Sequence, residues 1–321
     1  LQYLCPFHGE IRGEPDHDVE GGDPDNKVVE TDVILPQVVN YRKRVGFPST
    51  VDSEPSTVDK RRTLEYWEKG LFGNLKWTPD DRGPFYPCHH PGVLCSDARC
   101  SCFDNKIACE KSCSCGLGCK RKWKGCSCLS SARPNQKAKL ICWSDDRCVC
   151  YAKGRECDPD LCGTCGVADV LDPVHRHDDR VLQGRCRMSG LQRGIPKHTI
   201  LGDSGVHGLG LYACEDMFED DFVGEYKGET ITKPEAERRG AVNHHQKLSY
   251  LFSLNAEQEI DGTYFGGKTR FINHIVAKKA NLRPRIIMVN TVFRIAMFAN
   301  RTIKAGEELF FDYGPMFPQE Q

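Results

Sequence analysis

The chain has 321 residues, a formal net charge of −1 and 39% hydrophobic residues, which is typical of a globular protein with one large domain or two to three smaller ones. No stretch approaches the ~18 apolar residues of a membrane span, and no charged-then-apolar signal peptide opens the sequence. The 19 cysteines are odd in number and unevenly placed, which argues against a short disulfide scaffold.

Residues 1–87 are polar and in places acidic, so they predict linkers and short elements. One helix is predicted in STVDKRRTLEYWEKGLFGNLKW, with Ser56 or Thr57 as its N-cap. Cys5 and His8 in LCPFH resemble the end of a zinc motif whose other ligands would precede Leu1. A first residue other than Met also indicates a fragment. The sequence does not predict the path of residues 9–60.

Residues 88–186 are rich in cysteine and poor in aliphatic residues, so an ordinary hydrophobic core is not expected there. The pattern C-x-C-x6-C occurs twice, beginning at Cys100 and at Cys148. Adjacent C-x-C thiols do not easily bridge each other. Thiolates around zinc explain the pattern better, because zinc accepts four soft ligands without a rigid sequence spacing.

Two groups of nine ligands are expected from the spacings. Three zinc ions need twelve bonds, which nine ligands supply if three thiolates bridge, so the two groups would hold about six zinc ions. The ninth ligand of the first group is His90 or His89, with His90 favoured by its C-x-H spacing. The first group is Cys88, His90, Cys95, Cys100, Cys102, Cys109, Cys113, Cys115 and Cys119, and the second is Cys126, Cys128, Cys142, Cys148, Cys150, Cys157, Cys162, Cys165 and Cys186.

Four basic residues lie at the seam between the two groups: Lys120, Arg121, Lys122 and Lys124. They have two possible roles. They compensate the negative charge of the thiolate clusters, or they contact a phosphate backbone.

Residues 187–321 have the mix of apolar strands and turns of an ordinary domain. FVGEYKGETI and SYLFSLN predict strands, and RIIMVNTVFRIAMFA predicts a hairpin. TKPEAERRG predicts a helix with Thr232 as N-cap, Glu235 as capping-box partner and Gly240 as its stop. Short strands without βαβ alternation disfavour a doubly wound nucleotide-binding fold. Cys214 is expected to be a core thiol.

Five motifs occur in order over the last third of the chain: HGLGLYA, GEYKGE, SYLFSLN, RFINH and GEELFFDYG. Together they resemble a SET-domain protein lysine methyltransferase, and the cysteine region before them resembles the CXC (pre-SET) module of the Enhancer of zeste family. The resemblance implies a mainly β fold with few helices, made of short sheets with a C-terminal knot. It divides the chain into a partial upstream region (1–87), a CXC zinc module (88–186) and a SET catalytic domain (187–321).

The family is the catalytic subunit of Polycomb repressive complex 2. The resemblance therefore implies S-adenosylmethionine as cofactor, methylation of a histone H3 tail lysine, most often lysine 27, and transcriptional repression in the nucleus. Implied partners are the nucleosome and subunits of the embryonic ectoderm development WD-repeat type and the suppressor of zeste 12 zinc-finger type. No membrane partner is expected. Alternatives are a methyltransferase for lysine 9 of histone H3 and a non-catalytic zinc protein that binds DNA through its CXC modules.

The resemblance also assigns site residues. Tyr313 is the expected catalytic residue, with Tyr226 as a second tyrosine of the lysine channel. Phe311 lacks a hydroxyl, which leaves room for di- and trimethylated amines. Arg270 and Phe271 are expected to be structural supports. The expected cofactor-binding residues are Gly208, Leu209, Gly210, Ser249, Tyr250, Asn273, His274 and Tyr313.

Two departures from the family pattern affect the site. IVAKKAN follows His274 where the family has Ser-x-x-Pro-Asn, which suggests a shifted loop. No cysteine-rich segment follows Gly314, so another element must close the lysine channel. In the family, partner subunits and an upstream segment do this. The sequence does not decide whether the isolated chain is active, or the substrate lysine on chemical grounds.

Overall fold

The computed structural model describes residues 82–90, 95, 100–116, 118–128, 142, 148–245 and 250–314, all within one compact unit, Asn40–Gln321. Cys5, His8 and the helix expected after Ser56 lie outside these residues, as does Ser249. None of the helices within the described ranges has the length and apolar character needed to span a membrane.

The cysteine region is built from single helical turns rather than long elements. The two C-x-C-x6-C patterns form the same local structure, since α3 (Ser101–Asp104) follows Cys100 and α4 (Val149–Ala152) follows Cys148. In both copies the first cysteine carbonyl accepts an amide hydrogen bond of 2.9 Å from the residue four positions later. The remaining helical turns are α5 (Val167–Val170), the 3-10 helix η2 (Asp179–Leu182) and α6 (Gly190–Arg193).

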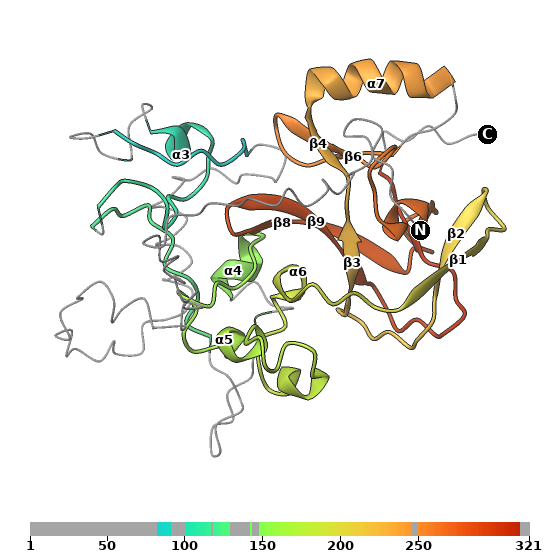
Figure 1. Cartoon of the computed structure of the whole chain (residues 1–321), viewed down its shortest axis with the longest axis horizontal. Coiled ribbons are helices and arrows are strands. Elements are labelled where there is room, and N and C mark those ends of the chain that lie inside the picture. Colours follow the sequence, from blue (N-terminus) through green and yellow to red (C-terminus); the bar gives the residue numbers. More distant parts are fainter. Residues whose placement is uncertain are drawn as a thin grey trace, which may run out of the picture. The chain divides into compact units, whose positions relative to one another are not determined.

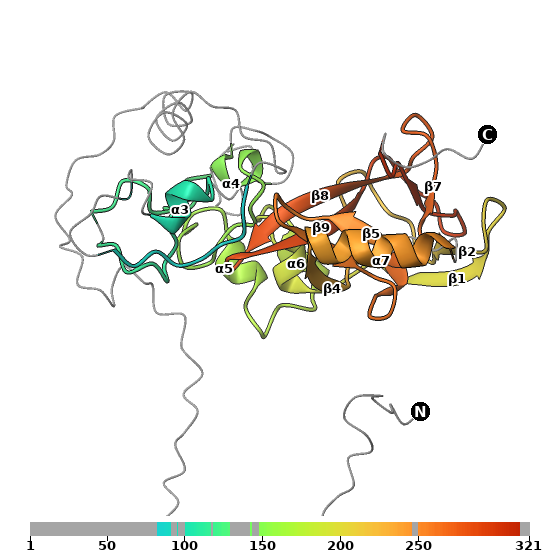
Figure 2. The ribbon, with the colours of Figure 1, turned by 90° about the horizontal axis from the view of Figure 1, so that it is seen from above.

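The largest sheet confirms the predicted hairpin. β8 (Leu282–Val289) and β9 (Val292–Ala299) are antiparallel, and β3 (Phe222–Tyr226) pairs with the other edge of β9. Ile287, Ile295 and Met297 are fully buried, and the runs 287–289 and 295–299 are buried at every residue, so this part of the sheet is covered on both faces. Figure 1 shows the hairpin extending from β3 toward α4, and Figure 2 shows the same hairpin from above.

Three smaller sheets complete the domain, and the mainly β prediction is confirmed. The order β4–β6–β5 joins Glu229–Thr232, Gln258–Asp261 and Leu251–Ser253, and β1 (Thr199–Asp203) pairs with β2 (Leu209–Ala213). β7 (Asn273–His274) follows the 3-10 helix η3 (Lys268–Phe271) and pairs in parallel with β10 (Phe310–Phe311). RFINH and ELFFDYG therefore lie side by side, as expected.

Two local predictions were wrong. Helix α7 runs from Lys233 to His245, so Gly240 does not end it. A Cβ at Gly240 would lie 3.4 Å from Leu251 Cδ1, so the glycine lies where the helix packs on β5, and tertiary packing outweighs its weak helix propensity. The carboxylate of Glu235 pairs with Arg238 and Arg239.

Cys214 is exposed rather than a core thiol, because the preceding Ala213 is the β2 residue that faces inward.

The hairpin end contacts the cysteine region directly. Met288 N donates to Gly154 O at 2.8 Å, and Glu156 N donates to Met288 O at 3.2 Å. The guanidinium of Arg285 lies 3.9 Å from the ring centroid of Tyr151. A cysteine module without an aliphatic core of its own is thus packed against the main sheet.

Candidate functional site

The first cysteine group brings its sulfur atoms into metal-binding range. Three sets of four donors each lie within 4.8 Å of one another, and one of them contains His90. His90 Nε2 lies 3.6 Å from Cys95 Sγ, whereas His89 is exposed, which favours His90 as the ligand. The sets are drawn from Cys88, His90, Cys95, Cys100, Cys102, Cys109 and Cys115. Cys113 joins them through a 3.5 Å contact with Cys102.

The second group forms a similar cluster further along the chain. Cys126, Cys128, Cys142 and Cys148 make one set of donors, and Cys126, Cys142, Cys157 and Cys165 make another. Cys150 Sγ lies 3.6 Å from Cys162 Sγ. Cys126, Cys142 and Cys157 are each at most 5% exposed.

Buried thiols at these distances fit a soft cation. Burial, together with the neighbouring Cys113 thiol, raises the pKa of Cys88 to about 12. Several thiolates cannot share such a space as anions unless a cation compensates them. Soft sulfur donors with a nearby imidazole are the ligands that zinc prefers. The described clusters therefore fit zinc, with Cys88 and its neighbours as ligands.

The basic seam is not one continuous surface. Arg121 is 4% exposed and its guanidinium donates to Ile107 O at 2.7 Å, so of its two possible roles the geometry favours charge compensation over phosphate contact. The Arg121 guanidinium therefore points toward a main-chain carbonyl near the first cluster and not toward solvent. Lys122 donates to Cys113 O and Cys115 O and is half-buried, whereas Lys120 and Lys124 are exposed.

The predicted catalytic aromatic residues lie in one cluster of rings. The centroid of Tyr226 lies 5.3 Å from that of Phe252, which lies 5.9 Å from Phe311. Phe311 lies 4.6 Å from Tyr313, and Tyr313 lies 5.3 Å from the imidazole of His274. Phe252 is the central link, a role that was not predicted for it. Its place within SYLFSLN, a predicted strand and one of the five motifs, was the available signal.

The two tyrosine hydroxyls are held by main-chain carbonyls. Tyr226 Oη donates to Tyr250 O at 2.8 Å, and Tyr313 Oη donates to Ile272 O at 2.6 Å. Burial raises the pKa of Tyr313 to about 12 and raises that of Tyr226 further. Both phenols are therefore neutral hydrogen-bonding groups at physiological pH.

Leu209, Asn273, His274 and Tyr313, which are expected to bind the cofactor, meet at the β7–β10 pair. Asn273 Nδ2 donates to His207 O and Leu209 O, both at 3.1 Å, so its carboxamide holds the loop that leads into β2. Tyr313 N donates to His274 Nδ1 at 3.1 Å. Gly208 and Leu209 are exposed, and Gly208 has a φ of +51°, which favours glycine.

Gly210 has a structural role that the sequence did not predict. A Cβ there would lie 2.2 Å from Glu308 Oε1, so a side chain at this position would displace the Glu308 carboxylate. Glu308 Oε2 accepts from Tyr212 Oη at 3.1 Å, and Glu308 Oε1 lies 3.4 Å from Asn273 Nδ2. Glu308 therefore links β2, β7 and the strand that carries the aromatic residues.

Arg270 supports the wall of the aromatic cluster. Its guanidinium donates to Gly262 O and Thr263 O at 2.8 and 2.9 Å. It also lies 5.6 Å from the ring centroid of Tyr250. These contacts agree with the structural role expected from the sequence.

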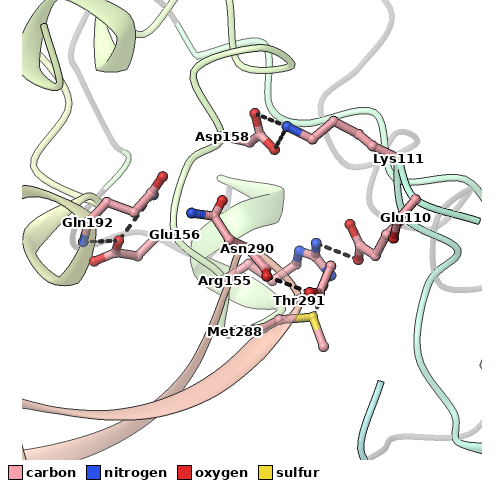
Figure 3. Close-up of a pocket in the computed structure, with 10 residues that line it drawn as sticks. Glu110, Lys111, Arg155, Glu156, Asp158, Gln192, Met288, Asn290 and Thr291 are labelled. Carbon is pink, nitrogen blue, oxygen red and sulfur yellow. Dashed lines mark hydrogen bonds and ion pairs between the residues drawn. The ribbon is translucent and has the colours of Figure 1, made fainter. Parts of the chain in front are cut away.

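A separate cavity of about 290 Å³ lies where the cysteine region meets the hairpin tip (Figure 3). Arg155 pairs with the buried carboxylate of Glu110 at 2.6 Å, and Lys111 pairs with Asp158 at 2.9 Å. Asn290 projects between these pairs and Gln192. The cavity adjoins the C-terminal end of β8, whereas the β7–β10 pair lies near the N-terminal end of β8. It is therefore not part of the aromatic site.

Models of two protein families match this chain. The SET domain model matches residues 208–314, and the CXC domain model matches residues 125–167. The aromatic cluster lies within the first match, and most of the second cysteine group lies within the second.

Curated relatives extend the similarity beyond these domains. Histone-lysine N-methyltransferase EZH2 of Chaetomium thermophilum is 36% identical over 338 residues, covering 97% of this chain and 20% of the relative. Histone-lysine N-methyltransferase MEDEA of Arabidopsis thaliana is 34% identical, covering 74% of this chain and 33% of the relative. The chain thus spans a fifth to a third of the length of these relatives.

Solved structures show the same similarity. The complex ctPRC2 in an autoinhibited conformation bound to S-adenosylmethionine contains a chain that is 36% identical, with a TM-score of 0.63 and coverage of 75% of this chain and 30% of that one. A chain of ctPRC2 in complex with H3K27me3 and H3K27M is also 36% identical, with a TM-score of 0.66 and coverage of 84% and 31%.

Proposed function

We propose that the chain is a histone-lysine N-methyltransferase of the Enhancer of zeste type, because its CXC and SET regions match those domain models and its relatives include EZH2 and MEDEA. The observation that carries the proposal is the ring cluster of Tyr226, Phe252, Phe311 and Tyr313 beside the β7–β10 pair. The proposed catalytic domain is 187–321, supported on a zinc module at 88–186.

The ring cluster suits the chemistry of lysine methylation. S-adenosylmethionine, which a similar solved complex binds, would supply the methyl group as a sulfonium. A free lysine has a pKa near ~10.4, and an apolar aromatic channel favours the neutral amine that must react. Neutral tyrosine hydroxyls orient that amine, and ring faces attract methylated ammonium products. Asn273, His274 and the Gly208–Gly210 segment are the proposed cofactor contacts, with Tyr250.

We propose lysine 27 of histone H3 as the substrate and trimethyl-lysine as the final product. A similar solved complex holds H3K27me3 and H3K27M, which supports the substrate. Phe311 supports the product, because it is 4% exposed and carries no hydroxyl that would hold a water in the space of further methyl groups.

The proposed setting is a Polycomb repressive complex in the nucleus, since the similar solved chains come from such complexes. The proposed partners include the WD-repeat and zinc-finger subunits of that complex. Contact with nucleosomal DNA is proposed for Lys120 and Lys124, whose side chains are exposed. About six zinc ions in two clusters would hold the module that carries these lysines.

Mass spectrometry of nucleosomes treated with the reconstituted complex tests the proposal. Methylation of lysine 27 up to the trimethyl form is expected, and Tyr313→Phe and Asn273→Ala are expected to lower it strongly. Methylation of lysine 9 instead would refute the substrate assignment, and unchanged activity in both variants would refute the site. No activity in the wild-type complex would favour a scaffold. Native mass spectrometry of the same chain counts the zinc ions.

A further inference from the structure

We propose that Asn281 is a positioning residue for methyl transfer, because its carboxamide fixes the register of the strand that carries Phe311 and Tyr313. Asn281 is 2% exposed. Its Nδ2 donates to Glu308 O at 2.8 Å, and its Oδ1 accepts from Phe310 N at 2.8 Å. The side chain thus satisfies one carbonyl and one amide on either side of Leu309. This inference rests on the proposed function.

The β7–β10 ladder is short enough to need such a clamp. Only two residue pairs form it, Asn273 with Phe310 and His274 with Phe311. A slip of one residue would turn Phe311 to the opposite face, since side chains alternate along a strand. The two bonds from Asn281 oppose that slip, and so keep Phe311 at 5.9 Å from the ring of Phe252 and Tyr313 at 5.3 Å from the imidazole of His274.

Asn281 is itself held from the far side. Its carbonyl accepts from Asn300 N at 2.8 Å, and β8 begins at the next residue, Leu282. The loop before it, in IVAKKAN, turns through a bond of 2.8 Å from Lys279 N to Val276 O. Residues 276–279 are exposed, so the departure of this loop from the family pattern is accommodated at the surface while Asn281 remains buried.

A merely structural role predicts lost stability without a specific kinetic effect. Asn255 offers a matched control, since it is fully buried and its Oδ1 accepts from Glu257 N and Gln258 N at 2.9 Å within the β5–β6 turn. Asn281→Ala and Asn255→Ala each remove a buried carboxamide and two hydrogen bonds that it makes to main-chain groups. Only the first of these frees the strand that carries the reacting groups.

The experiment measures kcat, the KM for S-adenosylmethionine, zinc content and thermal midpoint for the reconstituted complex with each variant. Asn281→Ala is expected to lower kcat about tenfold or more with an unchanged cofactor KM, because small misplacements of reacting groups have effects of this size. Asn281→Asp keeps the acceptor for Phe310 N and is expected to retain more activity. Asn255→Ala is expected to change kcat less than about twofold.

A double-mutant cycle with Tyr313→Phe decides whether Asn281 acts through the aromatic strand. We expect Asn281→Ala to lower kcat much less in the Tyr313→Phe background than in the wild type, because coupled residues are not additive. Equal effects in both backgrounds, or equal kcat for the Asn281 and Asn255 variants, would overturn the inference. An inactive wild-type complex would instead refute the proposed function.

Discussion

The carboxylate of Glu156 joins the cysteine region to helix α6, and its removal should destabilise the chain measurably. Glu156 is 5% exposed and accepts hydrogen bonds from Leu191 N, Gln192 N and Gln192 Nε2 at 2.6, 3.0 and 3.1 Å. These bonds hold the start of α6. A Cβ at Gly190 in that helix would lie 2.6 Å from the Phe222 ring of β3, so α6 packs closely on the main sheet.

The magnitude follows from the groups left without a partner in Glu156→Ala. Gln192 Nε2 keeps its bond of 2.9 Å to Cys157 O, so two amide donors are orphaned. A buried orphaned donor costs about 1–3 kcal/mol. Two effects reduce the total cost. Water can replace the lost partner of Gln192, which is half-buried. The variant also removes a carboxylate whose burial is unfavourable, as its raised pKa indicates. We therefore expect a loss of about 2–3 kcal/mol in the free energy of unfolding.

Urea unfolding of the zinc-loaded chain at neutral pH measures this loss. Asp178→Ala is the matched control, because Asp178 Oδ1 also accepts from a helix-start amide, Arg180 N at 2.9 Å, but in an exposed position. A clearly smaller loss is expected for the control, since water replaces an exposed partner. Equal losses for the two variants would refute the reasoning from burial.

Three further predictions follow from other parts of the structure. Thr291→Gly should raise the free energy of unfolding by about 1 kcal/mol. Asn290 and Thr291 have φ values of +47° and +73°, and a turn with two positive φ values favours the pair Asn-Gly. A lower urea midpoint for the variant would contradict this. The rate of methyl transfer should rise with pH as the substrate amine loses its proton. Ionisation of Tyr313 should not add an inflection to this curve in the working pH range, because its pKa is raised to about 12. Tyr313→Phe should therefore lower the rate and keep the shape of the pH profile. Removal of zinc by a chelator should expose Trp123, now 4% exposed, and shift its fluorescence to longer wavelength, a change that Trp123→Phe should reduce.

The sequence predicted the features that depend on local spacing. The repeated C-x-C-x6-C pattern becomes a repeated helical turn, because each copy places an extended cysteine before the same turn. The hairpin of β8 and β9 follows from two runs of β-branched and aromatic residues around Asn290. RFINH and ELFFDYG were predicted to lie together only through the family resemblance, since no local pattern pairs segments so far apart.

Tertiary structure alone decided which side chains complete the site. Phe252 joins Tyr226 to Phe311, and Asn281 bonds to both sides of Leu309, although the sequence pattern around each residue does not show which segment it contacts. Arg121 donates to a buried carbonyl, whereas its neighbour Lys120 is exposed. The run of basic residues in the sequence does not predict this difference. Spacing in the sequence fixes the strands and the groups of thiols. The partner of each side chain depends on contacts between distant segments, and these form only when the sheets pack against the cysteine module.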